Sequence, residues 1–212
     1  MKQALRELRR LSRARINYGS LVEAFIMNKE LLKTLQVTQN TPCRCGLMGC
    51  VLETYDPLWV VKLTGDPYEV RLFEVLRDEN IQTGFVKFKK IYPLENDTFI
   101  IVKQKVMPFN DLVLSTTLQA FASKYSEFIK TYYQEMSDVG KNQKSLNQKS
   151  LDAAFLVISE YSFEEITEIF DSLQRLSHLG YKVTDIGLSN LGFTDENQPV
   201  LYDAQIESLL PP

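Results

Sequence analysis

Three polar residues near the C-terminal end of the sequence have the side chains and the spacing for phosphate chemistry. Asp185 and Asn190 flank a short loop, and Asp203 follows Asn190 by thirteen positions. An apolar pair, a polar turn and a second apolar run lie between Asn190 and Asp203, which predicts strand, turn, strand and then a carboxylate. Two carboxylates and a carboxamide would then surround one point. Their oxygens are metal ligands or proton acceptors that suit a magnesium-bound phosphate.

An upstream lysine could supply the cation that such a phosphate needs. Lys62 ends the apolar run 58–62, where an ammonium group must find a partner. The next segment predicts a helix, because Asp66 suits its N-cap and Pro67 its first turn. This helix carries two possible carboxylate partners for the lysine, Glu69 and Glu74. The alternative is that Lys62 is only the outward residue of an edge strand.

A glycine-containing segment comes before the lysine. Gly46, Gly49 and Val51 form a Gly-x-x-Gly-x-Val pattern at the start of a predicted strand over 50–54. A turn at 55–57 then leads into the strand of Lys62. A glycine hairpin brings backbone N–H groups close to phosphates, because no side chain blocks the approach.

All three cysteines fall in the same segment, at Cys43, Cys45 and Cys50. A structural zinc site needs four ligands, and the sequence adds a single histidine, His178. We therefore expect no zinc site, and the clustered cysteines predict no disulfide framework. This cysteine usage favours an intracellular protein.

Apolar periodicity predicts helices on both sides of a group of strands. The expected elements are helices over 1–35, strands over 85–88 and 98–103, a break at 104–109, and helices over 111–136 and 152–179, the last with a break near 161–162. The pentapeptide 142–146 is repeated at once as 147–151, and we expect a polar linker there. Five arginines between 6 and 15 could contact nucleic acid, but we favour a solvated helix face.

Taken in order, these features resemble the catalytic core of the protein-kinase superfamily. The resemblance implies that Asp185 accepts the proton of the acceptor hydroxyl, and that Asn190 and Asp203 hold magnesium. It also implies that Lys62 holds the phosphates of ATP. Of the two glutamates, it favours Glu69 as the partner that orients Lys62, so we expect an ion pair between these two residues.

The same resemblance implies further contacts to the nucleotide. Gly46, Gly49 and Val51 would cover the phosphates, although this hairpin has only two of the family's three glycines. Gln104 and Val106 lie in the segment that resembles the hinge of the family. The backbone of that hinge binds the edge of adenine.

Several features of ordinary protein kinases are replaced. The family's His-Arg-Asp appears as Val-Thr-Asp at 183–185, and its Asp-Phe-Gly appears as Asp-Ala-Gln at 203–205. Gly187 stands where the family has a lysine, and the sequence given has nine residues after Asp203, with no activation segment. In these respects the sequence resembles small atypical kinases of tailed phages or bacteria and, less closely, aminoglycoside and choline kinases.

The resemblance implies an α+β fold, specifically a minimal protein-kinase-like bilobal fold. It would have a small antiparallel β-sheet N-lobe and a reduced helical C-lobe. We expect basic amphipathic helices over 1–40, the N-lobe over 41–107, and the truncated C-lobe with its catalytic loop over 108–212.

Two functions of different classes follow from this resemblance. The first is an ATP- and magnesium-dependent phosphotransferase that acts on a Ser or Thr hydroxyl of a protein. The second is a catalytically idle kinase-like domain that binds a protein partner. The presence of all five polar positions favours the enzyme, whereas the missing lysine and the short C-lobe favour the idle domain.

Composition narrows the remaining classes. The net charge of −3 argues against nucleic-acid binding, and no apolar run reaches the roughly 20 residues of a membrane helix. The apolar fraction of 44% is enough for a packed core. We therefore expect a soluble cytoplasmic protein, in the host cytoplasm if the source is viral, with a protein substrate or partner.

Overall fold

The computed structural model of the chain describes residues 27–37, 44–45, 49–95, 97–112, 115–141 and 147–209. The chain divides into two compact units. The first comprises 1–73 and 87–105, and the second comprises 74–86 and 106–212. The expected helices before residue 27, together with Gly46 and Cys43, lie outside the described residues.

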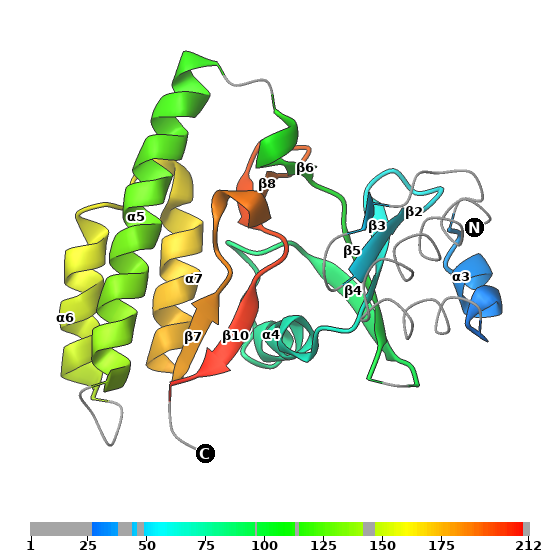
Figure 1. Ribbon diagram of the computed structural model, residues 1–212, viewed down its shortest axis with the longest axis horizontal. Coiled ribbons are helices and arrows are strands. Elements are labelled where there is room, and N and C mark those ends of the chain that lie inside the picture. The colour runs from blue at the N-terminus through cyan, green and yellow to red at the C-terminus, as the bar shows by residue number, and fades with distance from the viewer. Residues whose placement is uncertain are drawn as a thin grey trace, which may run out of the picture. The chain divides into compact units, whose positions relative to one another are not determined.

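The first unit is built on a five-stranded sheet in which every pair is antiparallel (Figure 1). Its strands, in spatial order, are β1 Arg44–Cys45, β2 Gly49–Glu53, β3 Trp59–Thr64, β5 Phe99–Gln104 and β4 Phe88–Pro93. The second unit is mainly helical. The chain therefore has the predicted α+β class, with an antiparallel N-terminal sheet.

One face of this sheet forms an apolar core. The buried side chains on it alternate along three strands, as a half-buried strand requires, and short helix α3, Lys29–Thr34, packs against them. Leu32 of α3 is fully buried there. The other core residues are Val37, Cys50, Leu52, Val61, Leu63, Ile100 and Val102.

The opposite face of the sheet carries charged residues. Lys62 pairs with Val51 on one side and Ile101 on the other, and Lys103 pairs with Val60. Paired residues share a face, and so do residues two positions apart on one strand. Because Lys103 lies two positions after Ile101, the partner of Lys62, the two lysines project from the same side of the sheet. Helix α4, Pro67–Asp78, supplies the carboxylate that meets them.

The start of α4 is fixed by the residues that the sequence indicated. The Asp66 carboxylate accepts hydrogen bonds from the backbone N–H groups of Tyr68 at 2.9 Å and Glu69 at 3.4 Å. Thr64, at the end of β3, accepts a hydrogen bond from the Asp66 N–H. The strand and the helix are thus joined by a capped turn, which sets where Glu69 stands.

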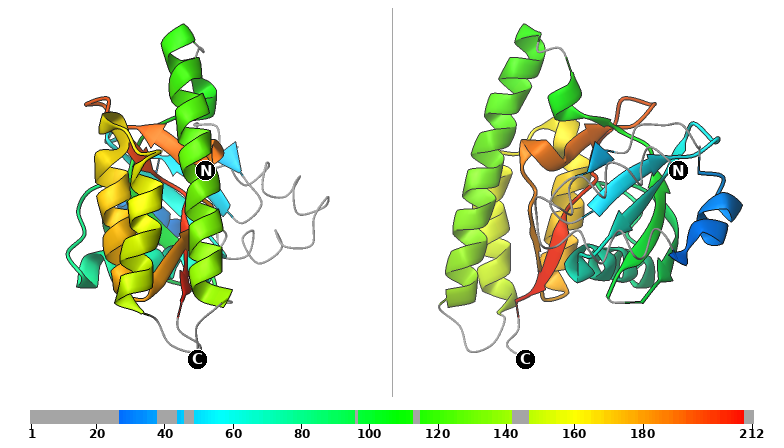
Figure 2. Two further views of the ribbon diagram at one scale, coloured as in Figure 1. Left: turned by 90° about the vertical axis from the view of Figure 1, so that its left-hand side faces the viewer. Right: turned by 45° about the vertical axis from the view of Figure 1, so that its right-hand side comes forward.

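Three helices pack side by side in the second unit, as the different views agree (Figures 1 and 2). They are α5 Thr116–Lys141, α6 Gln148–Ser159 and α7 Thr167–His178. Short 3-10 turns at Phe109–Asp111 and Glu164–Ile166 precede α5 and α7. α7 is followed by its C-cap Leu179 and then by Gly180, whose φ of 88° is the left-handed conformation typical of the residue after a helix C-cap.

Two small sheets of the second unit carry the C-terminal motif. The first pairs β7 Tyr181–Thr184 with β10 Gln205–Ser208. The second joins β6 Met107–Pro108, β8 Leu191–Phe193 and β9 Pro199–Leu201. The predicted order of loop, strand, turn, strand and carboxylate after residue 185 is confirmed.

Several predicted elements are displaced. The strand expected over 85–88 is wrong, because Phe85 forms a parallel bridge with Leu201 and β4 begins only at Phe88. α5 also runs five residues past the expected end. Asn147, expected in a linker, caps α6 by accepting a hydrogen bond from the Lys149 N–H. Asn is a strong N-cap, so the second copy of the repeat starts a helix.

Cys45 and Cys50 form a disulfide, a bond that the expectation of no disulfide framework did not include. The two residues are direct partners in the β1–β2 register, with Cα atoms 4.1 Å apart. Such cross-strand neighbours bring their Cβ atoms close enough for a bond. The disulfide closes the hairpin that contains the two glycines.

No helix in the described part of the chain is both long and apolar enough to span a membrane.

Candidate functional site

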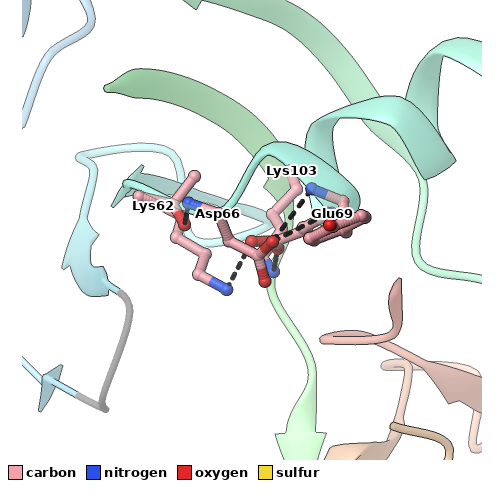
Figure 3. Close-up of polar contacts among 6 residues, drawn as sticks. Lys62, Asp66, Glu69 and Lys103 are labelled. Atoms are coloured by element: carbon pink, nitrogen blue, oxygen red, sulfur yellow. Dashed lines mark hydrogen bonds and ion pairs between the residues drawn. The ribbon is translucent and has the colours of Figure 1, made fainter. Parts of the chain in front are cut away.

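Lys62 and Glu69 form a buried ion pair between β3 and α4 (Figure 3). The Lys62 Nζ atom lies 2.6 Å from Glu69 Oε2, and the two side chains are only 7% and 1% exposed. The predicted pairing is confirmed, and so is the choice of Glu69, since Glu74 is exposed. A buried charge of this kind is stable only with a close partner.

Gly49 and Val51 surround the Lys62 side chain. A Cβ atom added at Gly49 would lie 2.6 Å from the Leu63 carbonyl oxygen and 3.2 Å from Lys62 Cε. Glycine is therefore required where β2 passes the lysine stem. Val51 is the cross-strand partner of Lys62 and stands beside it on the same face.

A second lysine, Lys103 of β5, shares the same carboxylate. Its Nζ atom lies 3.0 Å from Glu69 Oε1, and its side chain is 4% exposed. The Phe73 ring lies 5.9 Å from this ammonium group, close to the limit of a cation–π contact. Sequence reasoning missed Lys103 because its partner depends on the register between β3 and β5, which local sequence patterns do not give.

The Asp185 loop is held in an unusual conformation. Asp185 directly follows β7, is exposed, and has a φ of 57°, in the left-handed region that costs most side chains energy. Asn190 donates a hydrogen bond from its Nδ2 to the Asp185 carbonyl oxygen at 2.8 Å. The 3-10 turn Leu188–Asn190 places Asn190 for this bond.

Three tyrosines of α5 bind the backbone on both sides of Asp185. Tyr125 donates to the Ile186 carbonyl oxygen at 3.0 Å, Tyr133 accepts from the Ile186 N–H at 3.1 Å, and Tyr132 accepts from the Val183 N–H at 3.1 Å. These contacts position the loop without touching its side chains. Helical periodicity predicted burial for Tyr125, but no sequence signal identified the hydrogen bonds.

Burial raises the pKa of each of these tyrosines above its usual value near 10. For Tyr133 the negative charge of Asp185 adds to the increase in pKa that burial causes. The three hydroxyl groups are therefore neutral across the physiological range. A neutral Tyr125 can donate the hydrogen bond that Ile186 accepts.

Asp203 lies half-buried between β9 and β10. Its neighbour Tyr202 is tied to the Asp185 loop by two contacts: its N–H donates to the Asn190 carbonyl oxygen at 2.9 Å, and its hydroxyl donates to the Ser189 carbonyl oxygen at 2.6 Å. Gly192 permits this approach, because a Cβ atom there would lie 3.1 Å from the Tyr202 ring. The Asp203 carboxylate therefore projects from a turn that is held in place by the contacts of Tyr202.

Asn190 and Asp203 fit a magnesium ion by the chemistry of their oxygens. Because Asn190 uses its amide nitrogen for the Asp185 carbonyl, its Oδ1 is the atom that remains for a cation. Magnesium is commonly bound by one or two carboxylates together with phosphates and water. No cluster of three or more His, Cys, Asp or Glu that could hold a metal occurs among the described residues.

Of the two residues assigned to the hinge, Gln104 belongs to the first unit and Val106 to the second. Gln104 ends β5, where it pairs with Trp59, and its N–H donates to the Lys87 carbonyl oxygen at 2.8 Å. Val106 packs closely against Gly192: a Cβ atom added at Gly192 would lie 2.8 Å from the Val106 side chain.

The structure therefore brings the predicted residues together in two groups. Gly49, Val51, Lys62 and Glu69 meet in the first unit. Asp185, Asn190 and the turn that carries Asp203 meet in the second.

Comparisons with known proteins give no match in sequence and several in structure. No family model and no curated protein matches the sequence. The chain is similar in structure to aminoglycoside phosphotransferase APH(4)-Ia, with a TM-score of 0.41 and 8% identity over 86% of this chain and 73% of that one.

Two nucleotide complexes are similar at the same level. The spectinomycin phosphotransferase APH(9)-Ia bound to ADP and spectinomycin matches with a TM-score of 0.36 and 13% identity over 85% of this chain and 70% of that one. The GDP complex of a mutant aminoglycoside 2′-phosphotransferase-IIIa matches with a TM-score of 0.41 and 11% identity over 89% and 74%. At these levels we base the functional assignment on the side chains of this chain.

Proposed function

We propose that the protein is an ATP- and magnesium-dependent phosphotransferase that transfers the terminal phosphoryl group to a hydroxyl acceptor. The single observation that carries the proposal is the buried ion pair of Lys62 and Glu69, which is 2.6 Å long. A buried pair is a poor way to stabilise a fold, since apolar side chains usually do as well. A functional reason for retaining it is that an oriented ammonium group binds phosphates.

The position of Asp185 in the second unit also supports the proposal. Asp185 is an exposed carboxylate whose neighbour Ile186 is fixed by hydrogen bonds from α5, so its position is defined while it stays accessible to a ligand. In the proposal Asp185 orients the acceptor hydroxyl and takes its proton, as the base of phosphoryl transfer does.

Magnesium would be held by Asn190 and Asp203, and it would supply positive charge to the phosphate oxygens. Lys62 would bind the phosphates of ATP. The Gly49 backbone and Val51 would lie beside the phosphates, and the backbone of Gln104 and Val106 would bind adenine. In phosphoryl transfer most of the catalysis comes from such positioning and charge neutralisation.

We propose a Ser or Thr hydroxyl of a protein as the acceptor. A catalytically idle, partner-binding domain is the second candidate, and the presence of Gly187 two positions after Asp185 favours it. The two candidates differ in whether bound ATP is ever consumed.

Labelled ATP and magnesium, incubated with the purified protein, test the proposal. We expect label on a protein, either on the chain itself or in a cell lysate, and loss of the label with Asp203→Ala. Label on small molecules alone would replace the protein acceptor by a small-molecule one. No transfer to any acceptor, with ATP still bound, would favour the idle domain.

Calorimetry with the same proteins tests the metal assignment. Wild-type protein should bind ATP more tightly with magnesium than without it, and Asp203→Ala should lose this difference. An unchanged dependence on magnesium in Asp203→Ala would remove Asp203 from the site.

A further inference from the structure

The Glu69 carboxylate holds one lysine on each of its two oxygens. Oε2 lies 2.6 Å from Lys62 Nζ and Oε1 lies 3.0 Å from Lys103 Nζ (Figure 3). All three side chains are more than nine-tenths buried. The nearby Asp66 carboxylate, also buried, accepts hydrogen bonds from backbone N–H groups at the start of α4.

We propose that Lys103 is a positioning residue for phosphate binding, which acts through Glu69 on Lys62. The inference rests on the proposed function, because it gives Lys103 a role in the binding of ATP. Sequence resemblance assigned one lysine and one glutamate to this site, and the structure adds a second lysine from a different strand.

Charge compensation is the physical reason for the role. A phosphate that binds Lys62 competes with Glu69 for the hydrogens of the same ammonium group. If Lys62 were the only cation beside Glu69, phosphate binding to Lys62 would leave the buried Glu69 carboxylate poorly compensated, which is costly. Lys103 keeps one oxygen of Glu69 paired throughout. Glu69 can therefore stay charged and in place while Lys62 turns toward a phosphate.

The sheet register makes the arrangement rigid. Lys62 pairs with Ile101, two positions before Lys103, so the two lysines stand diagonally on one face. The ring of Phe73, one turn after Glu69 on α4, has its centroid 5.9 Å from the Lys103 ammonium. Helix and strands thus hold the three charged groups from three directions.

The affinities of ATP and of adenosine, measured by equilibrium dialysis with labelled ligands, test the proposal. Lys103→Met should lower the affinity for ATP by about tenfold and change the affinity for adenosine by less than about twofold, because adenosine has no phosphate. Lys103→Arg should restore most of the ATP affinity, since it keeps a cation beside Glu69. Lys33→Met, in the exposed pair of Lys33 and Glu30, is the matched control and should change neither affinity.

A second background separates action through Glu69 from direct contact with phosphate. In Glu69→Gln protein, the further change Lys103→Met should alter ATP affinity by less than about twofold, because the carboxylate through which Lys103 acts has gone. The double variant also decides the question if Lys103→Met alone does not fold, because it removes the charges of Glu69 and Lys103 together.

Two outcomes would overturn the inference. One is an unchanged ratio of ATP to adenosine affinity in Lys103→Met. The other is a further tenfold loss of ATP affinity when Lys103→Met is added to Glu69→Gln, which would mean direct contact with the nucleotide. A wild-type protein that binds no ATP would instead refute the proposed function itself.

Discussion

The two groups of candidate site residues are held in place in opposite ways. In the first unit the charged side chains themselves are buried, and Lys62, Glu69 and Lys103 fix one another. In the second unit Asp185 is exposed, and tyrosine hydroxyls of helix α5 hold the backbone of the neighbouring residues Val183 and Ile186. In the first group the same side chains would therefore serve both stability and function. In the second group, different residues would serve the two purposes. Substitutions should separate turnover from folding only at the second group.

The largest effect should come from Asp185→Asn. The amide keeps the shape of the side chain but cannot accept the acceptor's proton, so we expect turnover to fall by about 100-fold to 10,000-fold. ATP affinity and melting temperature should stay near wild type, since the residue is exposed and is assigned to the acceptor. Initial rates, calorimetry and a thermal melt measure the three quantities. A lower melting temperature with normal turnover per folded molecule would reassign Asp185 to a structural role.

Glu69→Gln should mainly reduce stability. It leaves the buried ammonium groups of Lys62 and Lys103 without their shared carboxylate, a loss of about 3–5 kcal/mol in the free energy of unfolding. Urea unfolding measures this change. Glu30→Gln, in an exposed lysine–glutamate pair, is the matched control and should have no measurable effect. Equal midpoints for the two variants would show that the buried group is not a stabilising unit.

High pH should destabilise the second unit. The pKa values of Tyr125, Tyr132 and Tyr133 are raised in the folded state, so the folded state retains protons that the unfolded state loses. Their contribution is complete below about pH 10 and declines above it, by up to about 1.4 kcal/mol per pH unit for each of the buried Tyr125 and Tyr132, and by less for the half-buried Tyr133, which solvent screens. Urea midpoints between pH 8 and 11, read with tyrosinate absorbance, follow the decline. Tyrosinate signal from all tyrosines before any unfolding would contradict the raised pKa values.

Tyr132→Phe should have the smallest effect of the four. It removes the acceptor of the buried Val183 N–H and should cost about 1–2 kcal/mol. Tyr161→Phe, at an exposed tyrosine after α6, is the control and should leave stability unchanged. Turnover should fall only a few-fold in Tyr132→Phe, because Tyr125 and Tyr133 still bind Ile186. A loss as large as that of Asp185→Asn would mean that the loop depends on this one hydroxyl.

Local patterns predicted much of the first group. Lys62 and Glu69 adjoin buried apolar runs, where a charge needs a partner, and Asp66 with Pro67 marked the start of the helix between them. Lys103 follows an apolar run in the same way, yet its partner depends on strand register. Only the pairing of Val60 with Lys103 shows that it shares a face with Lys62.

The second group shows the same limit. The turn signals between Asn190 and Asp203 are local, and they predicted the two strands correctly. The tyrosines of α5 bind backbone groups more than fifty residues away, and helical periodicity gives burial without partners. Phe85 was misplaced for a similar reason, since its neighbour Leu201 comes from the far end of the chain.

The tyrosine contacts also make the opening of the Asp185 loop measurable without any substitution. The amide hydrogens of Val183 and Ile186 are donated to tyrosine hydroxyls and can exchange with deuterium only when those bonds open. Their exchange times therefore record how often the backbone on each side of Asp185 leaves its place. A ligand that steadies the loop would lengthen both times, even where it contacts neither residue.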